Sequence, residues 1–571
     1  MENNWNYSEF EENDQLIDLI EALDVSKTIG ELLINRGIDS FDKAKKFFRP
    51  DIEELHNPFL MKGMDEAVIR IQDAIDNNEN ILIYGDYDVD GTTSVALMFQ
   101  YLRNFTKNLH YYIPDRYKEG YGVSNIGVDF AIDNNFSLVI ALDCGIKAVD
   151  KVERAKTNDV DFIICDHHTP GEILPNAIIL NPKQKGCTYP FKELCGCGVG
   201  FKLAQALNDS FALPFSEVEH LLDLVMVAIG ADMVSVMGEN RILAYHGLKK
   251  LNQAPRIGFS VLLELAGKQT PLTVTDVVFT LAPRINAAGR IKSGNKAVEL
   301  LLATTMMEAQ SIGKEINEYN TTRRLIEKDI TEEALTMISS NVDEDKQFTT
   351  VLYNDTWHKG VVGIVASRVI EKYYKPTIIL TESNGMAVGS VRSVENINVY
   401  EALCACEEHI EQFGGHMYAA GLTLRIEKID DFRVAFNEAV KIQSDAKRKI
   451  PKIAVEAEID FRDIFLEEQN SIPKFYRILK QFAPFGPDNM NPIFRTNMVR
   501  PVNSPKILKE AHLKIKLVQD DIEIDAIGFN FQDQFKYLDN KVFNVVYHLE
   551  ENRWKGKSNL QLILKDLKPY S

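Results

Sequence analysis

The chain has 571 residues, more than a single hydrophobic core supports, so we expect about three or four domains. Its formal net charge of −19 at pH 7 argues against a basic surface coat for duplex DNA. This charge leaves room for nucleic acid in a local groove, especially where bound metal ions add positive charge. No apolar run is long enough to span a membrane, and the acidic N-terminus lacks a signal-peptide pattern, so we expect a cytoplasmic protein.

The cysteines do not suit a disulfide framework. Their number is odd, 7, and they are scattered along the chain, so we expect reduced and mostly buried thiols. Cys187, Cys195 and Cys197 lie close in sequence, but they lack the Cys-x2-Cys spacing of a zinc site.

The first part of the chain leads to an acidic turn. Residues 1–55 form a polar lead-in with helical stretches, and residues 64–77 are amphipathic at helical spacing. Residues 81–84 predict a short buried strand, which ends at Gly85. Three carboxylates spaced by two follow it, and then Gly91 and the hydroxyl residues 92–94, which we expect to cap a helix. The carboxylates are Asp86, Asp88 and Asp90.

Three chemistries fit this acidic turn. Crowded carboxylates repel one another, and a hard divalent cation would join them. The Asp-x-Asp-x-Asp-Gly pattern also begins an EF-hand loop, but the twelfth position there must be Glu and is Leu97 here. A solvated acidic turn is the third possibility.

The segment that follows alternates between strands and helices, which predicts a parallel α/β sheet. The strands expected over residues 137–142 and 161–165 end in Asp143 and in Asp166-His167-His168. Because the carboxyl ends of parallel strands meet at one edge, we expect these side chains to converge with the acidic turn. Asp232, at the end of an apolar helix over 221–232, either faces the same edge or is an ordinary helix-end acid.

Three further regions complete the chain. Residues 295–341 predict continuous helix, either a connector between domains or a hairpin. Residues 348–424 alternate again, and small residues beside Ser390, Arg392 and His416 indicate either a backbone that approaches an anion or a tight turn with a solvated Arg. From residue 450 onward, short β-runs predict an OB-like barrel, either structural or binding single strands. The side chains we consider for such binding are Lys514, Lys516, Arg553, Trp554, Lys555 and Lys557.

Taken together, the motifs resemble the DHH phosphoesterase superfamily, and within it the bacterial single-strand-specific 5′→3′ exonucleases. The resemblance covers residues 80–424 and is carried by YGDYDVDG (84–91), LDCG (142–145), DHH (166–168), GADMV (230–234), APRINAAGR (282–290), WHKGVVGIVASR (357–368) and GGHMYAAG (414–421).

The fold implied is α/β and multidomain: a parallel-sheet DHH domain, a long helical connector, a second α/β domain of the DHHA1 type and a C-terminal OB-like barrel. The corresponding expected limits are 1–55 for the lead-in, 56–294, 295–341, 342–449 and 450–571.

The resemblance also implies a site with two divalent metal ions, Mn²⁺ or Mg²⁺. The implied ligands are Asp88, Asp90, Asp143, which bridges the ions, His167 and Asp232. Asp86 and His168 would lie beside the metals, and His416 would face the scissile phosphate. Arg116, Arg284, Ser390 and Arg392 would bind the terminal 5′-phosphate.

The implied activity is metal-dependent 5′→3′ hydrolysis of single-stranded DNA to 5′-mononucleotides in recombination and repair. The implied partners are single-strand binding protein and a RecQ-type helicase, and the chain would be a monomer. One alternative is a DHH phosphodiesterase for short oligoribonucleotides or cyclic dinucleotides. Such relatives are generally shorter or carry sensor or membrane segments, and the tail after residue 450 argues against this alternative. Another is a non-catalytic DHH replication scaffold, which would lack metal ligands.

Overall fold

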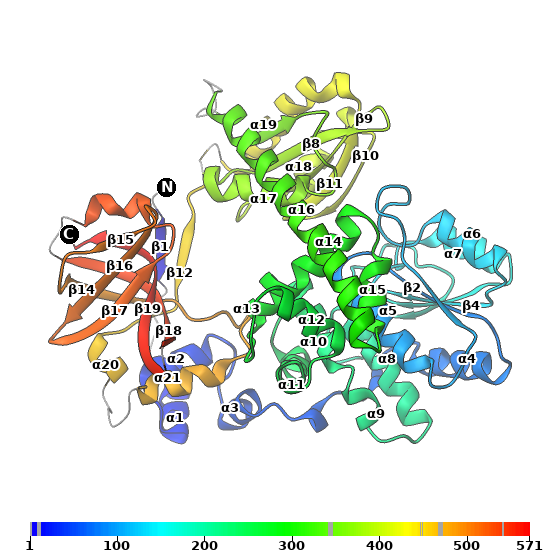
Figure 1. Ribbon diagram of the computed structural model, residues 1–571, viewed down its shortest axis with the longest axis horizontal. Helices are drawn as coiled ribbons and strands as arrows, with labels where there is room; N and C mark the ends of the chain where they lie inside the picture. The colour runs from blue at the N-terminus through cyan, green and yellow to red at the C-terminus, as the bar shows by residue number, and fades with distance from the viewer. Residues whose placement is uncertain are drawn as a thin grey trace. The chain divides into compact units, whose positions relative to one another are not determined.

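The computed structural model describes residues 3–7, 13–340, 347–445, 447, 449–465, 472–538, 542–554 and 556–570. The chain divides into two compact units (Figure 1). The smaller unit contains Met1–Asn6 and Glu318–Ile453, and the larger one contains Tyr7–Asn317 and Ala454–Ser571. The end of the chain therefore returns to the unit that holds its N-terminal half. None of the described helices combines the length and apolarity needed to cross a bilayer.

The larger unit contains the expected parallel sheet, five-stranded with the order β3-β2-β4-β5-β6. The register pairs Gly85 of β2 with Leu142 of β4, and Leu142 with Cys165 of β5. The residues that follow these three strand ends therefore leave the sheet side by side, as predicted. The strands are β2 (Ile81–Gly85), β3 (Leu109–Tyr112), β4 (Leu138–Leu142), β5 (Asp161–Cys165) and β6 (Ile178–Leu180).

Helices flank this sheet and extend the unit. Strands β2 and β4 are buried along their whole length, as in a sheet covered on both faces. The helices are α4 (Met64–Asp76), α5 (Val89–Leu102), α6 (Asn125–Asp133), α7 (Val149–Lys156), α8 (Gly196–Ser210), α9 (Ser216–Glu219), α10 (Leu222–Asp232), α11 (Gly238–Gln253), α12 (Ile257–Leu265), α13 (Val274–Asp276), α14 (Ala282–Ile291) and α15 (Asn295–Leu302).

Helix α5 begins earlier than the sequence pattern predicted. Its N-cap is Asp88, whose carboxylate accepts a hydrogen bond from the N–H of Gly91 at 3.0 Å. The expected capping by residues 92–94 is wrong, because their hydroxyl groups donate back to carbonyls of the first turn. A Cβ on Gly91 would lie 2.4 Å from the carbonyl oxygen of Asp86, so this close turn requires glycine. As a result, the second and third acids of the triplet lie at the start of a helix.

The predicted continuous helix over 295–341 is interrupted after α15. Ala303 is extended (ψ 132°), and α16 (Met306–Ser339) starts three residues later. The Thr305 hydroxyl accepts a hydrogen bond from the Glu308 N–H, and the Glu308 carboxylate accepts one from the Thr304 N–H, both at 3.3 Å. This reciprocal pairing resembles a capping box, and it starts a new helix within an otherwise helical pattern.

The smaller unit contains a second five-stranded sheet with the order β10-β11-β9-β8-β7. Only β7 and β8 are parallel. The glycine-containing segments over 412–424 form an antiparallel hairpin. The strands are β7 (Thr350–Tyr353), β8 (Thr377–Ser383), β9 (Met386–Arg392), β10 (Gln412–His416) and β11 (Ala419–Leu424), and the helices are α17 (Val362–Tyr373), α18 (Val399–Cys404) and α19 (Ile429–Gln443).

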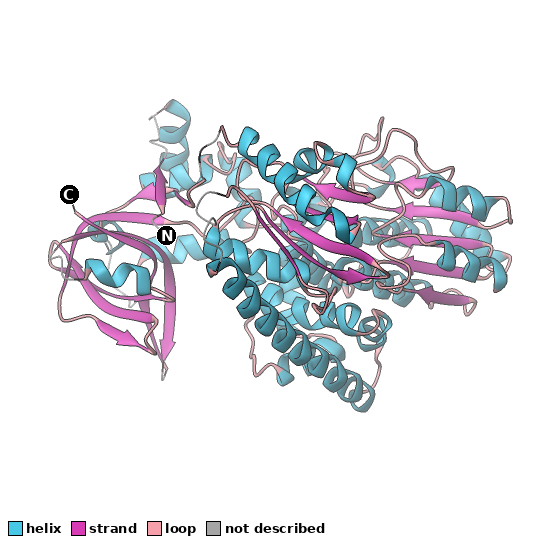
Figure 2. Cartoon of the chain, turned by 90° about the horizontal axis from the view of Figure 1, so that it is seen from above, coloured by secondary structure: helices cyan, strands magenta, loops and turns pink. Residues whose placement is uncertain are grey.

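The C-terminal strands form the predicted barrel, and Figure 2 shows them curving around a common core. The sheet order is β13-β14-β18-β19-β17-β16-β15, and additional pairing of β14 with β16 closes it. The N-terminal helices α1 (Asp14–Leu23), α2 (Lys27–Ile34) and α3 (Phe41–Phe48) contribute to the same hydrophobic core. The C-terminal elements are β13 (Ala457–Glu458), α20 (Phe461–Phe465), α21 (Lys474–Leu479), β14 (Phe494–Pro501), β15 (Lys506–Leu508), β16 (His512–Gln519), β17 (Ile522–Gly528), β18 (Phe543–Trp554) and β19 (Lys557–Pro569); β1 (Asn4–Tyr7) pairs with β12 (Lys452–Val455).

A buried arginine on α11 joins the N-terminal helices to the C-terminal part of the larger unit. Arg241 of α11 is 3 % exposed and pairs with no carboxylate of the described residues. Its guanidinium lies 3.7 Å from the centre of the Phe47 ring and donates to the Phe47 carbonyl at 2.8 Å. It also donates to the carbonyls of Gln481, Phe482 and Ala483. Burial and the neighbouring Arg36 lower the pKa of Arg241 to about 9, so the group stays charged at neutral pH.

Arg241→Ala is expected to lower the free energy of unfolding of the larger unit by about 3 kcal/mol or more, because buried carbonyls lose their donors. Arg154→Ala, which removes an exposed ion pair with Asp129, is the control and should change it by about 1 kcal/mol or less. Urea unfolding followed by circular dichroism measures both. If both variants lose about 1 kcal/mol or less of unfolding free energy, the structural role of Arg241 is contradicted.

Candidate metal centre

Acidic residues follow three neighbouring strands of the parallel sheet. Asp86 follows β2, Asp143 follows β4 and Asp166 follows β5. Asp143 has φ 59°, a left-handed conformation that is uncommon outside glycine and that often marks turns and functional sites. All three carboxylates are buried.

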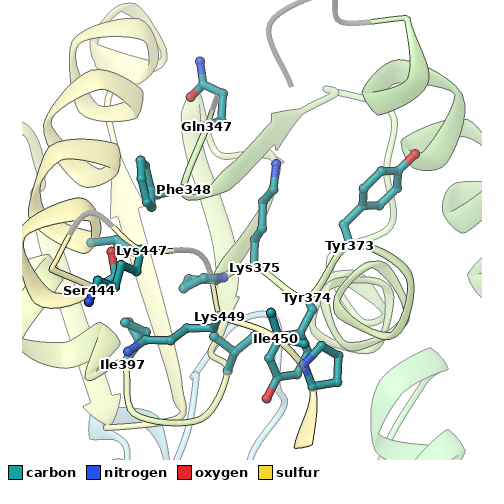
Figure 3. Close-up of a pocket in the computed structure, with 14 residues that line it drawn as sticks. Gln347, Phe348, Tyr373, Tyr374, Lys375, Ile397, Ser444, Lys447, Lys449 and Ile450 are labelled. Carbon is teal, nitrogen blue, oxygen red and sulfur yellow. The ribbon is translucent and has the colours of Figure 1, made fainter. Parts of the chain in front are cut away.

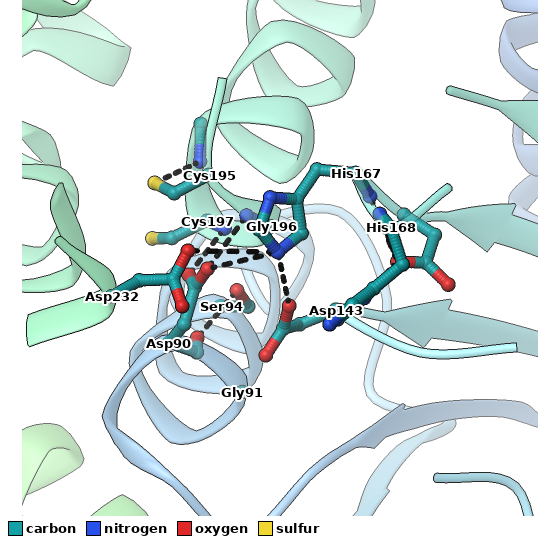
Figure 4. A network of polar contacts seen from close by, with 12 residues as sticks. Asp90, Gly91, Ser94, Asp143, His167, His168, Cys195, Gly196, Cys197 and Asp232 are labelled. Atoms are coloured by element: carbon teal, nitrogen blue, oxygen red, sulfur yellow. Dashed lines mark hydrogen bonds and ion pairs between the residues drawn. The ribbon is translucent and has the colours of Figure 1, made fainter. Parts of the chain in front are cut away.

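The ring of His167 is the meeting point of three carboxylates. Its Nε2 lies 3.2 Å from an oxygen of Asp143, 3.6 Å from one of Asp232 and 3.9 Å from one of Asp90. Figure 4 shows these side chains pointing toward one another from different elements. Ligand atoms close enough to hold a metal ion occur in two groups that share His167: one adds Asp143 and His168, and the other adds Asp90 and Asp232.

The N-terminus of α8 fixes Asp90. The backbone N–H groups of Gly196 and Cys197 each donate to one Asp90 oxygen at 2.7 Å. A Cβ on Gly196 would lie 2.5 Å from the Asp143 side chain, so glycine lets the helix end approach both acids. Backbone donors at a helix N-terminus are well suited to hold a carboxylate.

Asp166 organises the two histidines without joining either metal-holding group. Its carboxylate accepts hydrogen bonds from the N–H of Ile146 at 2.9 Å and of His167 at 2.8 Å, and pairs with Nδ1 of His168 at 2.7 Å. Burial would raise the pKa of Asp166, but the hydrogen bond with His168 and the backbone donors outweigh burial and lower it. The Nε2 of His168 lies 3.2 Å from the hydroxyl of Tyr121.

Burial and repulsion between neighbouring carboxylates dominate the pKa directions at the candidate metal centre. Burial and neighbouring carboxylates, Asp88 among them, raise the pKa of Asp143, and they raise that of Asp90 to about 7 and that of Asp232 to about 8. Burial lowers the pKa of His167 to about 3, so its ring is neutral and keeps a lone pair for a ligand bond.

Buried polar atoms without a hydrogen-bond partner indicate that these residues could bind a cation. Among the described residues, Asp143 Oδ1, His167 Nε2 and Asp86 Oδ2 are buried without a hydrogen-bond partner. Burying such atoms costs free energy of folding unless a bound ion takes the place of the missing partner. Carboxylate oxygens with one or two imidazoles suit Mg²⁺ or Mn²⁺, so the donor set fits the implied metals.

The structure brings most of the expected site residues together. Asp90, Asp143, His167 and Asp232 converge, and His168 joins Asp143 and His167 in one of the two metal-holding groups, whereas Asp86 belongs to neither group among the described residues. Asp88 is half-buried and belongs to neither metal-holding group among the described residues, although its charge raises the pKa of its acidic neighbours. The individual role of each side chain stays a prediction.

The sequence did not predict the roles of some residues of the site. Asp166 was seen as part of the triplet but not as the partner of His168. Tyr121 and the N–H groups of residues 196–197 were not expected at all. The Gly-Cys-Gly sequence at 196–198, which opens α8, is the signal that indicates a close helix N-terminus.

Two arginines expected at a phosphate pocket lie in the larger unit. The guanidinium of Arg116 stacks over the Tyr87 ring at 4.6 Å and its charge lowers the pKa of Asp86 against the dominant effect of burial. Arg284 of α14 donates to the side chain of Asn317 at 3.2 Å and to the carbonyl of Thr280 at 2.8 Å.

The other expected phosphate contacts lie in the smaller unit. Ser390 and Arg392 are two residues apart on β9 and so share one face of the sheet. Arg392 pairs with Ala419 of β11, and Ala419 pairs with His416 of β10, so Arg392 and His416 occupy one row. A Cβ on Gly363, at the start of α17, would lie 3.0 Å from the Arg392 guanidinium.

A separate cavity of about 420 Å³ lies near the other end of α17 (Figure 3). Aromatic and basic side chains line it, namely Phe348, Tyr373, Tyr374, Lys375, Lys447 and Lys449. It contains none of the residues expected from the sequence.

Basic side chains on the barrel form a short row. Lys514 and Lys516 alternate with buried residues on β16, and Lys506 of β15 is paired with Lys514. Like charges facing each other across strands are unfavourable unless an anion joins them. Arg553 is exposed and lies 2.9 Å from Glu551. Lys555 and the side chains of Trp554 and Lys557 lie outside the described residues.

Comparison with known proteins identifies the family. Three family models match in chain order: the DHH family, N-terminal domain, over residues 80–229, the DHHA1 domain over 345–442 and the RecJ OB domain over 462–566. Together they match the sheet with the acidic edge, the second sheet and the barrel.

Whole-chain similarity gives the same result. The single-stranded-DNA-specific exonuclease RecJ of Bacillus subtilis is 36% identical over 561 residues, which cover 97% of this chain and 70% of that protein. Crystal structures of Thermus thermophilus RecJ with Mn²⁺ and with Mg²⁺ match 100% of this chain at 25% identity. Their TM-scores are 0.85 and 0.79, and the matches cover 80% and 79% of those chains. The chain therefore belongs to the RecJ family of single-stranded-DNA-specific exonucleases, within the DHH superfamily.

Proposed function

We propose that this chain hydrolyses single-stranded DNA from its 5′ end and releases 5′-mononucleotides, in recombination and repair. The observation that carries the proposal is the convergence of the buried carboxylates of Asp90 and Asp143 and the more exposed carboxylate of Asp232 on the unpartnered Nε2 of His167. The match to the RecJ OB domain separates the chain from phosphodiesterases that lack a barrel. The full set of acids and histidines argues against a non-catalytic scaffold.

We assign two divalent cations to Asp88, Asp90, Asp143, His167 and Asp232, with Asp143 shared between them. The Thermus relatives crystallised with Mn²⁺ and Mg²⁺, and the imidazole favours Mn²⁺. Bound there, the cations would activate water for attack and neutralise charge on the scissile phosphate.

The chain's own residues orient this centre. Gly196 and Cys197 hold the Asp90 carboxylate through their backbone N–H groups, which leaves further lone pairs for a cation. Burial opposes a rise in the pKa of His168, but the hydrogen bond and charge of Asp166 outweigh burial and raise it, and the same contact fixes the orientation of the ring. We assign His168 and Asp86 to orienting ligands and water, and His416 to the scissile phosphate.

We assign the 5′-phosphate to Arg116, Arg284, Ser390 and Arg392. A guanidinium meets phosphate oxygens through paired N–H donors, which suits recognition of a terminal phosphate and sets the polarity of hydrolysis. The basic row of the barrel, with Arg553 and Trp554, would follow the DNA strand farther from the end.

Family membership also supports the remaining expectations. We propose that the chain acts as a monomer in the cytoplasm, where its DNA substrate lies, together with single-strand binding protein and a RecQ-type helicase. The domain limits given from the sequence stay predictions, and the N-terminal helices share the core of the barrel.

Asp143→Asn keeps the shape of the side chain and removes its charge, so kcat should fall about 1000-fold, equivalent to about 4 kcal/mol of transition-state stabilisation. Single-strand affinity, followed by fluorescence anisotropy, should stay close to that of the wild type. Asp150→Asn, at an exposed site on α7, is the control. A variant that keeps a tenth or more of the wild-type rate at saturating Mn²⁺ would rule out a central role for Asp143.

Arg392→Ala should remove the preference for a 5′-phosphorylated over a 5′-hydroxyl oligonucleotide, measured as a ratio of kcat/KM values. Loss of a paired, charge-assisted contact corresponds to about 10- to 100-fold in that ratio. Arg425→Ala, in an exposed ion pair with Glu411 of the same unit, should leave the ratio unchanged. An unchanged ratio in the Arg392 variant would exclude the proposed phosphate contact.

Lys514→Gln should weaken binding to long single-stranded DNA and lower the slope of log affinity against log salt by about 0.7, as expected for one phosphate contact. The control is Lys249→Gln, at an exposed position of α11. Titrations at several salt concentrations give the slope. Identical slopes for both variants would count against the barrel row as a DNA contact.

A further inference from the structure

Two loops behind the candidate metal centre determine where its side chains point. The first is the segment over residues 193–197, where the loop before α8 continues into the first turn of that helix: the backbone of Leu194 accepts a hydrogen bond from the His167 ring, and Gly196 and Cys197 hold Asp90. The second, over 233–237, connects α10 with α11 and begins directly after Asp232. The separation of these loops therefore sets the distance between Asp232 and the pair His167 and Asp90.

One amide group joins the two loops. Asn240, in the first turn of α11, is fully buried. Its Nδ2 donates to the carbonyl of Ser235 at 2.9 Å and to the carbonyl of Glu193 at 2.6 Å. A side-chain NH₂ group offers two N–H donors on one atom, so it links two carbonyls at once.

The loop over 233–237 is also held on its other side. The Val236 N–H donates to the carbonyl of Pro487 at 2.9 Å, and Val236 is fully buried. A Cβ on Gly486 would lie 2.3 Å from a Val236 methyl group, so the turn from the C-terminal part packs tightly here. Met233, next to Asp232, has φ 57°. With one side fixed by this turn, the amide of Asn240 decides how far the loop lies from residues 193–197.

We propose that Asn240 is a positioning residue for the metal centre, whose side-chain amide fixes the separation between Asp232 and the pair His167 and Asp90. The proposal rests on the metal-ligand roles proposed above. In this proposal Asn240 contacts neither the metal nor the DNA, and it positions the metal ligands through the two loops. Removing a partner that is hydrogen-bonded directly to a metal ligand costs about 10- to 100-fold in metal affinity, and Asn240 acts on the same ligands one step farther out, through the backbone of residues 193 and 235.

The larger unit contains a matched control in Asn208. Asn208 of α8 is also fully buried, and its Nδ2 also donates to two carbonyls, those of Leu213 at 2.9 Å and Pro214 at 3.1 Å. The side-chain oxygens of both asparagines have no hydrogen-bond partner among the described residues. The acceptors of Asn208 follow the end of α8, whereas the metal centre lies at its start. The two residues thus match in burial and bonding and differ in what they hold.

The test compares Asn240→Leu with Asn208→Leu in the full chain. Leucine has a similar shape and lacks the donor, so both variants should lose comparable thermal stability. Mn²⁺ binding without DNA, measured from the electron paramagnetic resonance of free Mn²⁺, should weaken about tenfold or more in the Asn240 variant and stay within about twofold of the wild type in the Asn208 variant. Nuclease activity of the Asn240 variant should recover at high Mn²⁺.

Equal Mn²⁺ affinity in the two variants would overturn the proposal. Where Asn240→Leu does not fold, Asn240→Ser with Asn208→Ser replaces the pair; the hydroxyl keeps one donor, and Mn²⁺ affinity should again fall only at position 240. Asp143→Asn separates this inference from the proposed function. If Asp143→Asn abolishes Mn²⁺ binding while Asn240→Leu leaves it intact, the positioning role alone fails. If Asp143→Asn also leaves Mn²⁺ binding intact, the metal centre itself fails.

Discussion

Mutual repulsion among buried carboxylates is the constraint on which the larger unit depends. A parallel sheet directs the ends of its strands to one edge, and here three of those ends carry acids. Two more acids arrive from the starts and ends of helices, Asp90 from α5 and Asp232 from α10. Burial without a counter-charge would be strongly unfavourable, so a bound cation is the term that makes this arrangement stable.

The protein supplies partial compensation through its backbone. The N-terminus of α8 meets Asp90, and the N–H groups after β5 meet Asp166. These donors fix the direction of the Asp90 and Asp166 carboxylates but leave Oδ1 of Asp143 and Nε2 of His167 without a hydrogen-bond partner. The fold therefore rigidifies the outer parts of the site and leaves its centre for an ion. The same division of roles explains why glycines occur where helix starts approach the acids, at Gly91 and Gly196.

Local patterns predicted the strands of the catalytic sheet and their acidic ends, because periodicity and strand-end position are encoded within a few residues. The predicted start of α5 was wrong, because the N-cap is Asp88 and not one of the hydroxyl residues 92–94 that follow it. The break at Ala303 depends on a side-chain pairing, Thr305 with Glu308, that a hydrophobic pattern does not register. The roles of Asp166 and Asn240 depend on partners far along the chain, which only the folded structure brings together.

The order of the chain within the larger unit affects how the enzyme is made. All the acids and histidines assigned to the metal centre precede residue 233, whereas the turn that clamps Val236 and the carbonyls of residues 481–483 that accept from Arg241 lie beyond residue 480. Between them, residues 318–453 of the smaller unit must be synthesised. A nascent chain on the ribosome thus carries every proposed metal ligand long before the loop after Asp232 is held from both sides. Synthesis of the segment over residues 481–487 is therefore the step after which the centre of this nuclease can be fully braced.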